Sequence, residues 1–285
     1  MAQTCHCDKW ERTMRYGGIE FGGTKIVYGI SDETGLLDRQ QIPTDTPDIV
    51  FAKLVSYFQK QNIQSLGIAA FGPIDLESGI ITTTPKPHWA NVNLRNAFAS
   101  LSVPIYIQTD VNGACLGEVI YGAGRRHDKV IYGTIGTGIG FGIYNNHQLI
   151  VAEGGHSLIH RVSNDRFAGT CPYHKDCLES LASGPAMEKR WQIPAECNTN
   201  VDAWYMEAEY LAQGITNIAM FYNPEIIILG GGVMHHDGLL EMIQEKVHAK
   251  INGYILEPVL MKPQLGDDAG LYGAIALAKG EGNGK

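Results

Sequence analysis

Two glycine turns, each set between β-rich runs, constrain the fold of this chain more than any other feature. Residues 16–30 read YGGIEFGGTKIVYGI, and residues 130–144 read VIYGTIGTGIGFGIY. Each stretch predicts a strand, a glycine turn and a second strand, because glycine allows the backbone conformations that a tight turn needs. The repetition favours an α/β chain built as two similar lobes around a shared cleft. A coincidence between two unrelated β-hairpins is the alternative that this pattern leaves open.

The first turn, Gly22-Gly23-Thr24-Lys25, has groups that suit a phosphate. Backbone N–H groups can approach an anion at the glycines, Thr24 adds a hydroxyl and Lys25 adds a positive charge. The spacing is not that of a Walker loop, so this turn is a weak signal by itself. With Gly136-Thr137-Gly138 on the opposite lobe, however, the two turns could hold a polyphosphate from both sides.

Residues 153–179 contain a Cys/His cluster at the spacing of metal ligands. Cys171, His174 and Cys177 form a C-x-x-H-x-x-C pattern, and His156 precedes them. Zinc prefers four tetrahedral ligands drawn from thiolates and imidazoles, and one tight loop can supply several of them. The pattern therefore indicates a zinc site made by these four side chains. Two buried free cysteines beside a surface histidine are the alternative.

The proposed zinc would be structural, because four protein ligands leave no open position for a catalytic water. Glu153 and Glu179 flank the cluster. A metal-fixed loop would hold both carboxylates in one place, where they could accept hydrogen bonds from sugar hydroxyls. Taken singly, each could equally be a solvated surface glutamate.

Asp110 lies where a predicted strand gives way to a predicted helix. Strand residues end at Gln108, and apolar residues then recur at helical spacing. Asp110 is therefore expected at the N-cap, where the helix dipole would keep its carboxylate ionised and its base strength modest. Two interpretations remain, a helix cap or an acceptor for the proton of a substrate hydroxyl.

Proline and glycine mark further turns. Gly72-Pro73 ends an apolar run that is typical of a buried strand, and the proline-rich residues 84–91, which end at Asn91, are expected to form a loop over a cleft. Ser183-Gly184-Pro185 opens a helix. Gly230-Gly231-Gly232 follows an apolar strand. Its backbone could contact a flat or phosphorylated group, or it could form a tight strand-to-helix turn.

Helical periodicity predicts a helix from about residue 205 to residue 222, after an irregular polar stretch at 191–204. Asn223-Pro224 ends it, because the residue before proline disfavours the helical conformation. The last apolar run, residues 269–278, predicts a final helix that Asp267 or Asp268 can cap.

Composition excludes several classes of protein. The formal net charge is −8 without a basic run, so nucleic acid is not an expected partner. No apolar run approaches the ~20 residues of a membrane span. Residues 1–15 lack the apolar middle of a secretory signal. The six cysteines are too few for a disulfide scaffold in 285 residues, and a reduced cytoplasmic chain is expected.

Together, these motifs resemble those of the ROK family of sugar kinases, over roughly residues 16–278 and in the family's order. The resemblance implies an α/β, two-lobed actin-like (ribonuclease H-like) fold with an interlobe cleft. It implies an N-terminal lobe at 16–120, a C-terminal lobe at 121–266 and a final helix at 267–280 that packs back on the first lobe. ATP and Mg²⁺ are implied as cofactors beside Zn²⁺, and a homodimer is expected.

The resemblance also implies a role for each motif, with Asp110 of the D-x-N motif as the catalytic base. The residues implied to bind the sugar are Gly72, Pro73, Asn91, Thr109, Asp110, Glu153, His156 and Glu179. Those implied to bind the nucleotide are Gly22, Gly23, Thr24, Lys25, Thr137, Gly138, Gly184, Gly230, Gly231 and Gly232. The implied metal ligands are His156, Cys171, His174 and Cys177.

Three departures from the usual family pattern, Glu20, Thr109 and His174, resemble the bacterial fructokinase branch. They favour ATP-dependent phosphorylation of D-fructose to fructose 6-phosphate. A kinase for glucose, mannose, N-acetylglucosamine or N-acetylmannosamine is the alternative. A sugar-sensing repressor is disfavoured, because the residues before the first strand are too few for a helix-turn-helix module.

Overall fold

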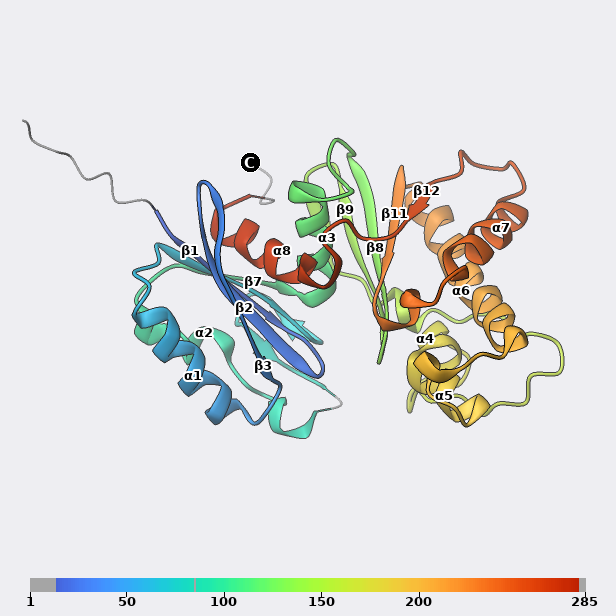
Figure 1. Ribbon diagram of the computed structural model, residues 1–285, viewed down its shortest axis with the longest axis horizontal. Coiled ribbons are helices and arrows are strands. Elements are labelled where there is room, and N and C mark those ends of the chain that lie inside the picture. The colour runs from blue at the N-terminus through green and yellow to red at the C-terminus, as the bar shows by residue number, and fades with distance from the viewer. Residues whose placement is uncertain (1–13, 85, 282–285) are drawn as a thin grey trace, which may run out of the picture.

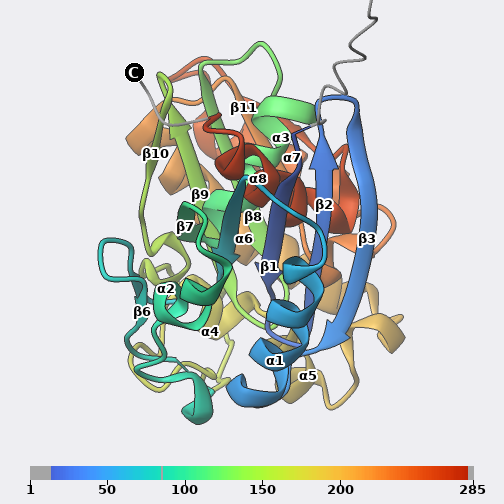
Figure 2. The same ribbon diagram turned by 90° about the vertical axis from the view of Figure 1, so that its left-hand side faces the viewer.

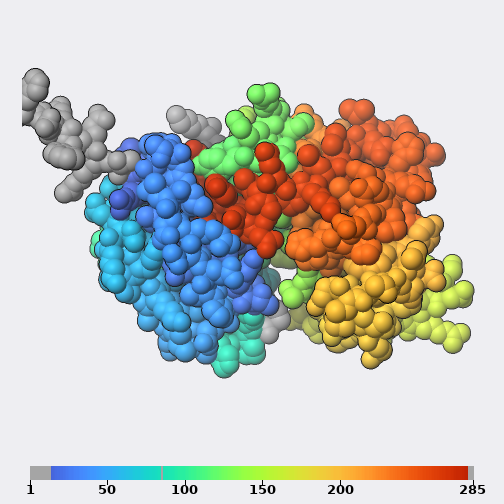
Figure 3. Space-filling model, in the orientation of Figure 1, coloured from blue at the N-terminus to red at the C-terminus, as the bar shows by residue number. Residues whose placement is uncertain are grey.

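Two five-stranded sheets form the framework of the protein, whose computed structural model describes residues 14–84 and 86–281. The sheets lie side by side in Figure 1, and the parts of the chain built on them are called the N-terminal and C-terminal lobes. Figure 3 shows a hollow between the two lobes, below the red C-terminal helix. This arrangement agrees with the predicted two-lobed α/β fold.

The N-terminal sheet has the strand order β3-β2-β1-β4-β7. Strands β1, β2 and β3 are antiparallel, and β1, β4 and β7 are parallel. Helix α1 covers the outer face and is nearest the viewer in Figure 2. The bounds are β1 Tyr16–Phe21, β2 Lys25–Asp32, β3 Gly35–Pro43, α1 Pro47–Gln59, β4 Ser65–Ala70, β5 Ile74–Asp75, β6 Ile80–Ile81, α2 Leu94–Ala97 and β7 Ile105–Thr109.

The C-terminal sheet repeats this topology in the order β10-β9-β8-β11-β12. Its first three strands are again antiparallel and its last two again run parallel to β8. The glycine turns therefore stand at equivalent places, β1–β2 and β8–β9, which supports a duplicated unit over coincidence. The bounds are β8 Lys129–Ile135, β9 Ile139–Asn145, β10 Gln148–Ile150, α4 Leu178–Ala182, α5 Gly184–Trp191, α6 Val201–Tyr222, β11 Ile226–Gly230, α7 Leu239–Ile251 and β12 Val259–Met261.

Helices α3 (Asp110–Tyr121) and α8 (Ala269–Ala278) lie between the sheets (Figure 1). They cross closely because glycines face each other: a Cβ added at Gly273 would lie 1.7 Å from the carbonyl oxygen of Gly113. Helix α8 also packs on β1 and β4, and α3 packs on β8 and β9. The helix that begins at Asp110 thus contacts both lobes.

Two local expectations are wrong. Helix α6 begins at Val201 rather than near residue 205, because Asn200 accepts a hydrogen bond from the N–H of Asp202 and caps the helix. Asp110 is the first residue of α3 rather than its cap, because the Thr109 hydroxyl accepts the Asn112 N–H at 3.2 Å.

The final helix has the predicted bounds but lacks the predicted cap. Asp268 stands at its N-cap without a side-chain capping bond. Arg39 instead pairs with Asp268 at 2.7 Å, and Lys25 pairs with Asp267 at 3.0 Å. These acids therefore join the final helix to the N-terminal sheet.

Among the described residues, no helix is both long enough and apolar enough to span a bilayer. We expected residues 1–15 to lack a secretory signal. Residues 1–13 of that stretch lie outside the described part of the chain.

Candidate functional site

The two glycine turns face each other across the lobes. A Cβ added at Gly23 would lie 3.5 Å from the Thr137 hydroxyl oxygen. The first turn is closed by the Gly22 N–H, which donates to the Lys25 carbonyl at 3.0 Å. The second is closed by the Gly136 N–H, which donates to the Gly138 carbonyl at 2.9 Å. The structure thus brings the two candidate phosphate turns together.

The other two glycine motifs meet at the second turn. The Gly184 N–H donates to the Gly136 carbonyl at 2.8 Å, and a Cβ at Gly136 would lie 4.0 Å from the Gly232 nitrogen. Gly231 has φ of 94° and little space for a side chain, since an added Cβ would lie 2.4 Å from the Ile135 carbonyl oxygen. All four glycine motifs that were predicted to bind nucleotide therefore lie in one region.

Asp110 is a partly buried carboxylate at the start of α3. Its Oδ1 accepts the N–H of Val111 at 2.9 Å. Burial raises the pKa of Asp110 to about 6, the backbone N–H groups oppose this, and the nearby charge of Glu153 raises the pKa further. The expectation that Asp110 is a weak base is therefore wrong, because desolvation raises its pKa by more than the N–H groups at the helix end lower it.

The ligand atoms of His156, Cys171, His174 and Cys177 all lie within 4.8 Å of one another. His156 Nδ1 is 3.7 Å from both sulfur atoms, and Cys171 Sγ is 3.9 Å from His174 Nδ1. Bond lengths of ~2.3 Å to sulfur and ~2.05 Å to nitrogen in a tetrahedron give sulfur–nitrogen edges of ~3.6 Å. The four side chains could therefore hold one zinc ion with little movement.

Glu179 connects this cluster to the second glycine turn. Its Oε2 accepts the Ile139 N–H at 3.0 Å, and its Oε1 is 3.9 Å from His156 Nε2. His156 thus presents Nδ1 to the sulfur atoms and Nε2 to Glu179. The charge of Glu153 acts on Asp110, whereas Glu179 and His156 face each other on the C-terminal lobe.

The remaining predicted sugar residues lie on the N-terminal lobe. The Pro73 carbonyl accepts the N–H of Thr82 at 2.9 Å, which joins the Gly72-Pro73 turn to the segment that leads to Asn91. Asn91 is exposed with φ of 63°, and Trp89 beside it is buried against Phe21. No described hydrogen bond joins Gly72, Pro73 or Asn91 to Asp110.

Glu20 belongs to the site, although the sequence analysis named it only as a departure from the family pattern. Burial raises its pKa to about 7, the charge of Asp110 adds to this, and Lys25 opposes it. Its Oε2 is buried without a hydrogen-bond partner in the described chain. Its position near the end of β1, just before the first glycine turn, could have indicated a place in the site, because residues at the end of a strand lie next to the turn that follows.

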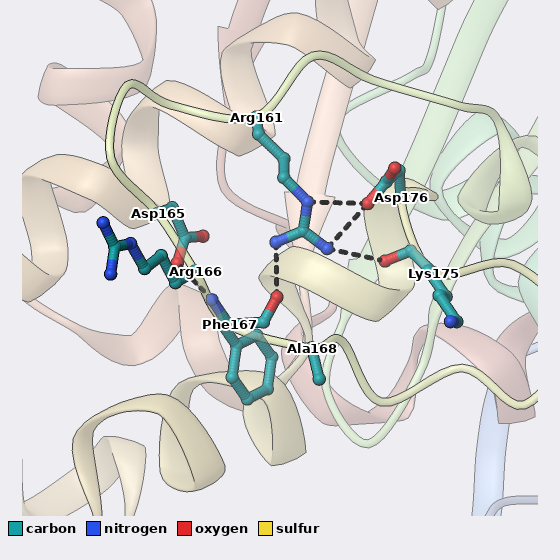
Figure 4. A pocket seen from close by; sticks show the side chains of 7 residues that line it. All are labelled: Arg161, Asp165, Arg166, Phe167, Ala168, Lys175 and Asp176. Atoms are coloured by element: carbon teal, nitrogen blue, oxygen red, sulfur yellow. Dashed lines mark hydrogen bonds and ion pairs between the residues drawn. The ribbon is translucent and has the colours of Figure 1, made fainter.

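One cavity, of about 410 Å³, is lined by none of the predicted site residues. Figure 4 shows one of its two arginines, Arg161, hydrogen-bonded to Asp176 and to the carbonyls of Phe167 and Lys175. With these bonds made, Arg161 is not free for a ligand, and we assign the cavity no function. Its lining residues are Arg161, Asp165, Arg166, Phe167, Ala168, Lys175 and Asp176.

Comparisons with known proteins agree with this geometry. The chain is 38% identical to a fructokinase of Streptococcus mutans, covering 93% of this chain and 97% of the relative. It is 39% identical to a fructokinase of Zymomonas mobilis, covering 92% of this chain and 96% of that relative. The structure matches a ROK family glucokinase of Streptomyces griseus in complex with glucose and AMPPNP, with a TM-score of 0.73 and 25% sequence identity. The match covers 93% of this chain and 99% of the glucokinase chain. Residues 16–281 match the model of the ROK family, and the chain belongs to that family.

Proposed function

We propose that this chain transfers the γ-phosphoryl group of ATP to D-fructose and forms fructose 6-phosphate. The observation that carries the proposal is the place of Asp110, a carboxylate of raised pKa beside Glu153, in a fold whose two glycine turns face each other. The fructokinases of S. mutans and Z. mobilis, at 38% and 39% identity, support fructose as the acceptor.

Asp110 would orient the 6-hydroxyl of fructose and accept its proton. The hydroxyl oxygen forms the new bond to the γ-phosphorus, the bond from that phosphorus to the ADP oxygen breaks, and the proton moves to an Asp110 oxygen. A pKa of about 6 leaves Asp110 largely ionised at neutral pH and makes it a stronger base than a solvated aspartate.

The facing turns would bind the phosphates through backbone N–H groups and the Lys25 ammonium. Mg²⁺, when bound, would neutralise phosphate charge. Glu20 fits such an ion, because its Oε2 is buried near Lys25 and Asp110 and has no hydrogen-bond partner among the described residues. Gly184 and residues 230–232 would line the adenosine side.

Zinc would be a structural ion held by His156, Cys171, His174 and Cys177. The sulfur–nitrogen distances of 3.7–3.9 Å support this assignment. By fixing His156, the ion would also fix the imidazole edge that faces Glu179. These residues, with Glu153, Thr109, Asn91 and the Gly72-Pro73 turn, would hold the sugar hydroxyls.

The acceptor sugar is tested by a coupled ADP-release assay on fructose, glucose, mannose, N-acetylglucosamine and N-acetylmannosamine. We expect kcat/KM for fructose to exceed that for each other sugar by at least about tenfold. Glucose is the second candidate, because the S. griseus relative was solved with glucose. A preference for any other sugar would disprove the fructose assignment and leave the kinase assignment intact.

Removal of zinc is expected to weaken sugar binding more than nucleotide binding. The ion would fix His156, which faces Glu179, whereas the first phosphate turn lies on the other lobe. We expect chelation to raise the KM for fructose at least about tenfold and the KM for ATP less than about threefold, with recovery on addition of zinc. An equal loss of both affinities would instead indicate general unfolding.

The pH profile should report the ionisation of Asp110. Because the deprotonated carboxylate is the active form, kcat/KM for fructose should fall about tenfold per pH unit below a midpoint near 6. The charge of Glu153 raises the pKa of Asp110, so Glu153→Gln should move the midpoint to lower pH. An unmoved midpoint would show that another group titrates.

We also propose a homodimer, to be tested by light scattering, and a cytoplasmic location, to be tested by cell fractionation.

A further inference from the structure

Two segments of the described chain cross between the lobes, and both contact the side chain of Glu118. The first crossing, residues 122–128, connects α3 to β8. The second, residues 262–268, connects β12 to α8 and is the red segment that runs between the lobes in Figure 1. Any closure of the cleft has to be a movement about these two segments.

The carboxylate of Glu118 accepts three backbone N–H groups from the two crossings. Its Oε2 accepts the N–H of Ala123 at 2.7 Å and that of Gln264 at 3.2 Å. Its Oε1 accepts the N–H of Leu265 at 2.8 Å. The residue is 0% exposed, and it makes no ion pair within the described ranges. Both carboxylate oxygens of Glu118 therefore have backbone N–H groups as hydrogen-bond partners.

The main chain around Glu118 is built to fit this contact. Its carbonyl accepts the N–H groups of Gly122 at 3.0 Å and Gly124 at 2.9 Å, and these bonds end α3. A Cβ added at Gly122 would lie 2.1 Å from Glu118 Oε2. Only glycine leaves room there for the carboxylate, so the first crossing wraps closely around it.

We propose that Glu118 is a positioning residue that couples the two crossings when the lobes close. The buried carboxylate of Glu118 must keep its N–H partners during the movement, and because it serves both crossings it makes them move together. Glu118 also shares α3 with Asp110, and the second crossing continues to Asp267, which pairs with Lys25 at 3.0 Å. Glu118 thereby sets the position of the base relative to the first phosphate turn. This inference rests on the proposed kinase function.

Glu118→Gln tests the proposal with a side chain of nearly the same shape. The amide NH₂ would face backbone N–H donors and leave at least one crossing unpaired. We expect kcat to fall at least about tenfold, because a misplaced base loses proximity to the hydroxyl. We also expect the decrease in radius of gyration on addition of fructose and AMPPNP, measured by X-ray scattering, to be largely lost.

Two control variants separate coupling from loss of stability. Glu207→Gln changes another carboxyl that is 0% exposed, within the core of the C-terminal lobe and away from both crossings. Leu54→Ala weakens the core of the N-terminal lobe. Both should keep the ligand-induced compaction and a kcat within about threefold of wild type. The proposal is wrong if Glu118→Gln keeps both the compaction and the kcat. It is also wrong if Leu54→Ala loses both while its Tm falls as much as that of Glu118→Gln.

Hydrogen exchange of the wild type tests the coupling even if Glu118→Gln does not fold. Peptides that cover residues 122–126 and 262–266 should gain protection together when fructose and AMPPNP bind. Protection of one crossing alone would overturn the coupling, as would a wild type that turns over fructose without compaction. A wild type that does not turn over fructose would instead count against the proposed substrate.

Discussion

Asp110→Asn is expected to lower kcat by roughly 100- to 10,000-fold while the protein stays folded. Asparagine keeps an oxygen for the N–H of Val111, which Asp110 Oδ1 accepts at 2.9 Å, but it cannot accept the hydroxyl proton. The coupled ADP-release assay measures the loss, and circular dichroism with a thermal melt measures the fold.

The thermal melt should show that the variant is at least as stable as the wild type at pH 8. Burial raises the pKa of Asp110 to about 6 in the folded protein, above that of an unfolded aspartate. A raised carboxyl pKa costs stability as pH rises through that window, so the neutral amide removes the cost. Loss of activity together with a higher or equal Tm would assign the defect to chemistry.

Asp202→Asn is the matched control, since Asp202 also lies in the first turn of a helix, α6, but is exposed. Its kcat should stay within about twofold of wild type. If Asp110→Asn retains more than about a tenth of wild-type kcat, Asp110 is not the base and the mechanism proposed here fails.

Local motifs made much of the site predictable. The ligands Cys171, His174 and Cys177 lie within one short loop, so their spacing alone placed three of the four cluster members together. The glycine turns were predictable because a turn between two strands is also local. The repeated topology of the two sheets then follows from the repeated sequence pattern.

The first residue of a helix and the pKa of a carboxyl were harder to predict, because each depends on several interactions that oppose one another. Thr109 rather than Asp110 caps α3, and both residue types favour that position. The helix end should lower the pKa of Asp110, but burial has the larger effect. Burial depends on the packing of both lobes, which the local sequence does not encode.

Contacts between distant segments could not be predicted from one sequence. Glu118 meets Gln264 and Leu265, which lie far along the chain, and no local pattern marks any of them. Lys25 was predicted for phosphate binding, but its pairing with Asp267 was not. These contacts follow from the way α3 and α8 pack between the sheets.

Gly273→Ala tests that packing and is expected to destabilise the protein by about 3 kcal/mol or more. An added Cβ would lie 1.7 Å from the backbone carbonyl oxygen of Gly113, so the helices must separate. Alanine ordinarily favours a helix over glycine, which makes destabilisation a specific result of this contact. We expect the Tm to fall by roughly 5–10 °C.

Gly232→Ala is the control for the thermal melt, because an added Cβ there has nothing within 4 Å. Its Tm should change by less than about 2 °C. Since α3 carries Asp110 at its first residue, separation of the helices in Gly273→Ala should also lower kcat. A Gly273→Ala protein with wild-type Tm would mean that α3 and α8 do not approach each other this closely, and the position assigned to Asp110 between the lobes would then be wrong.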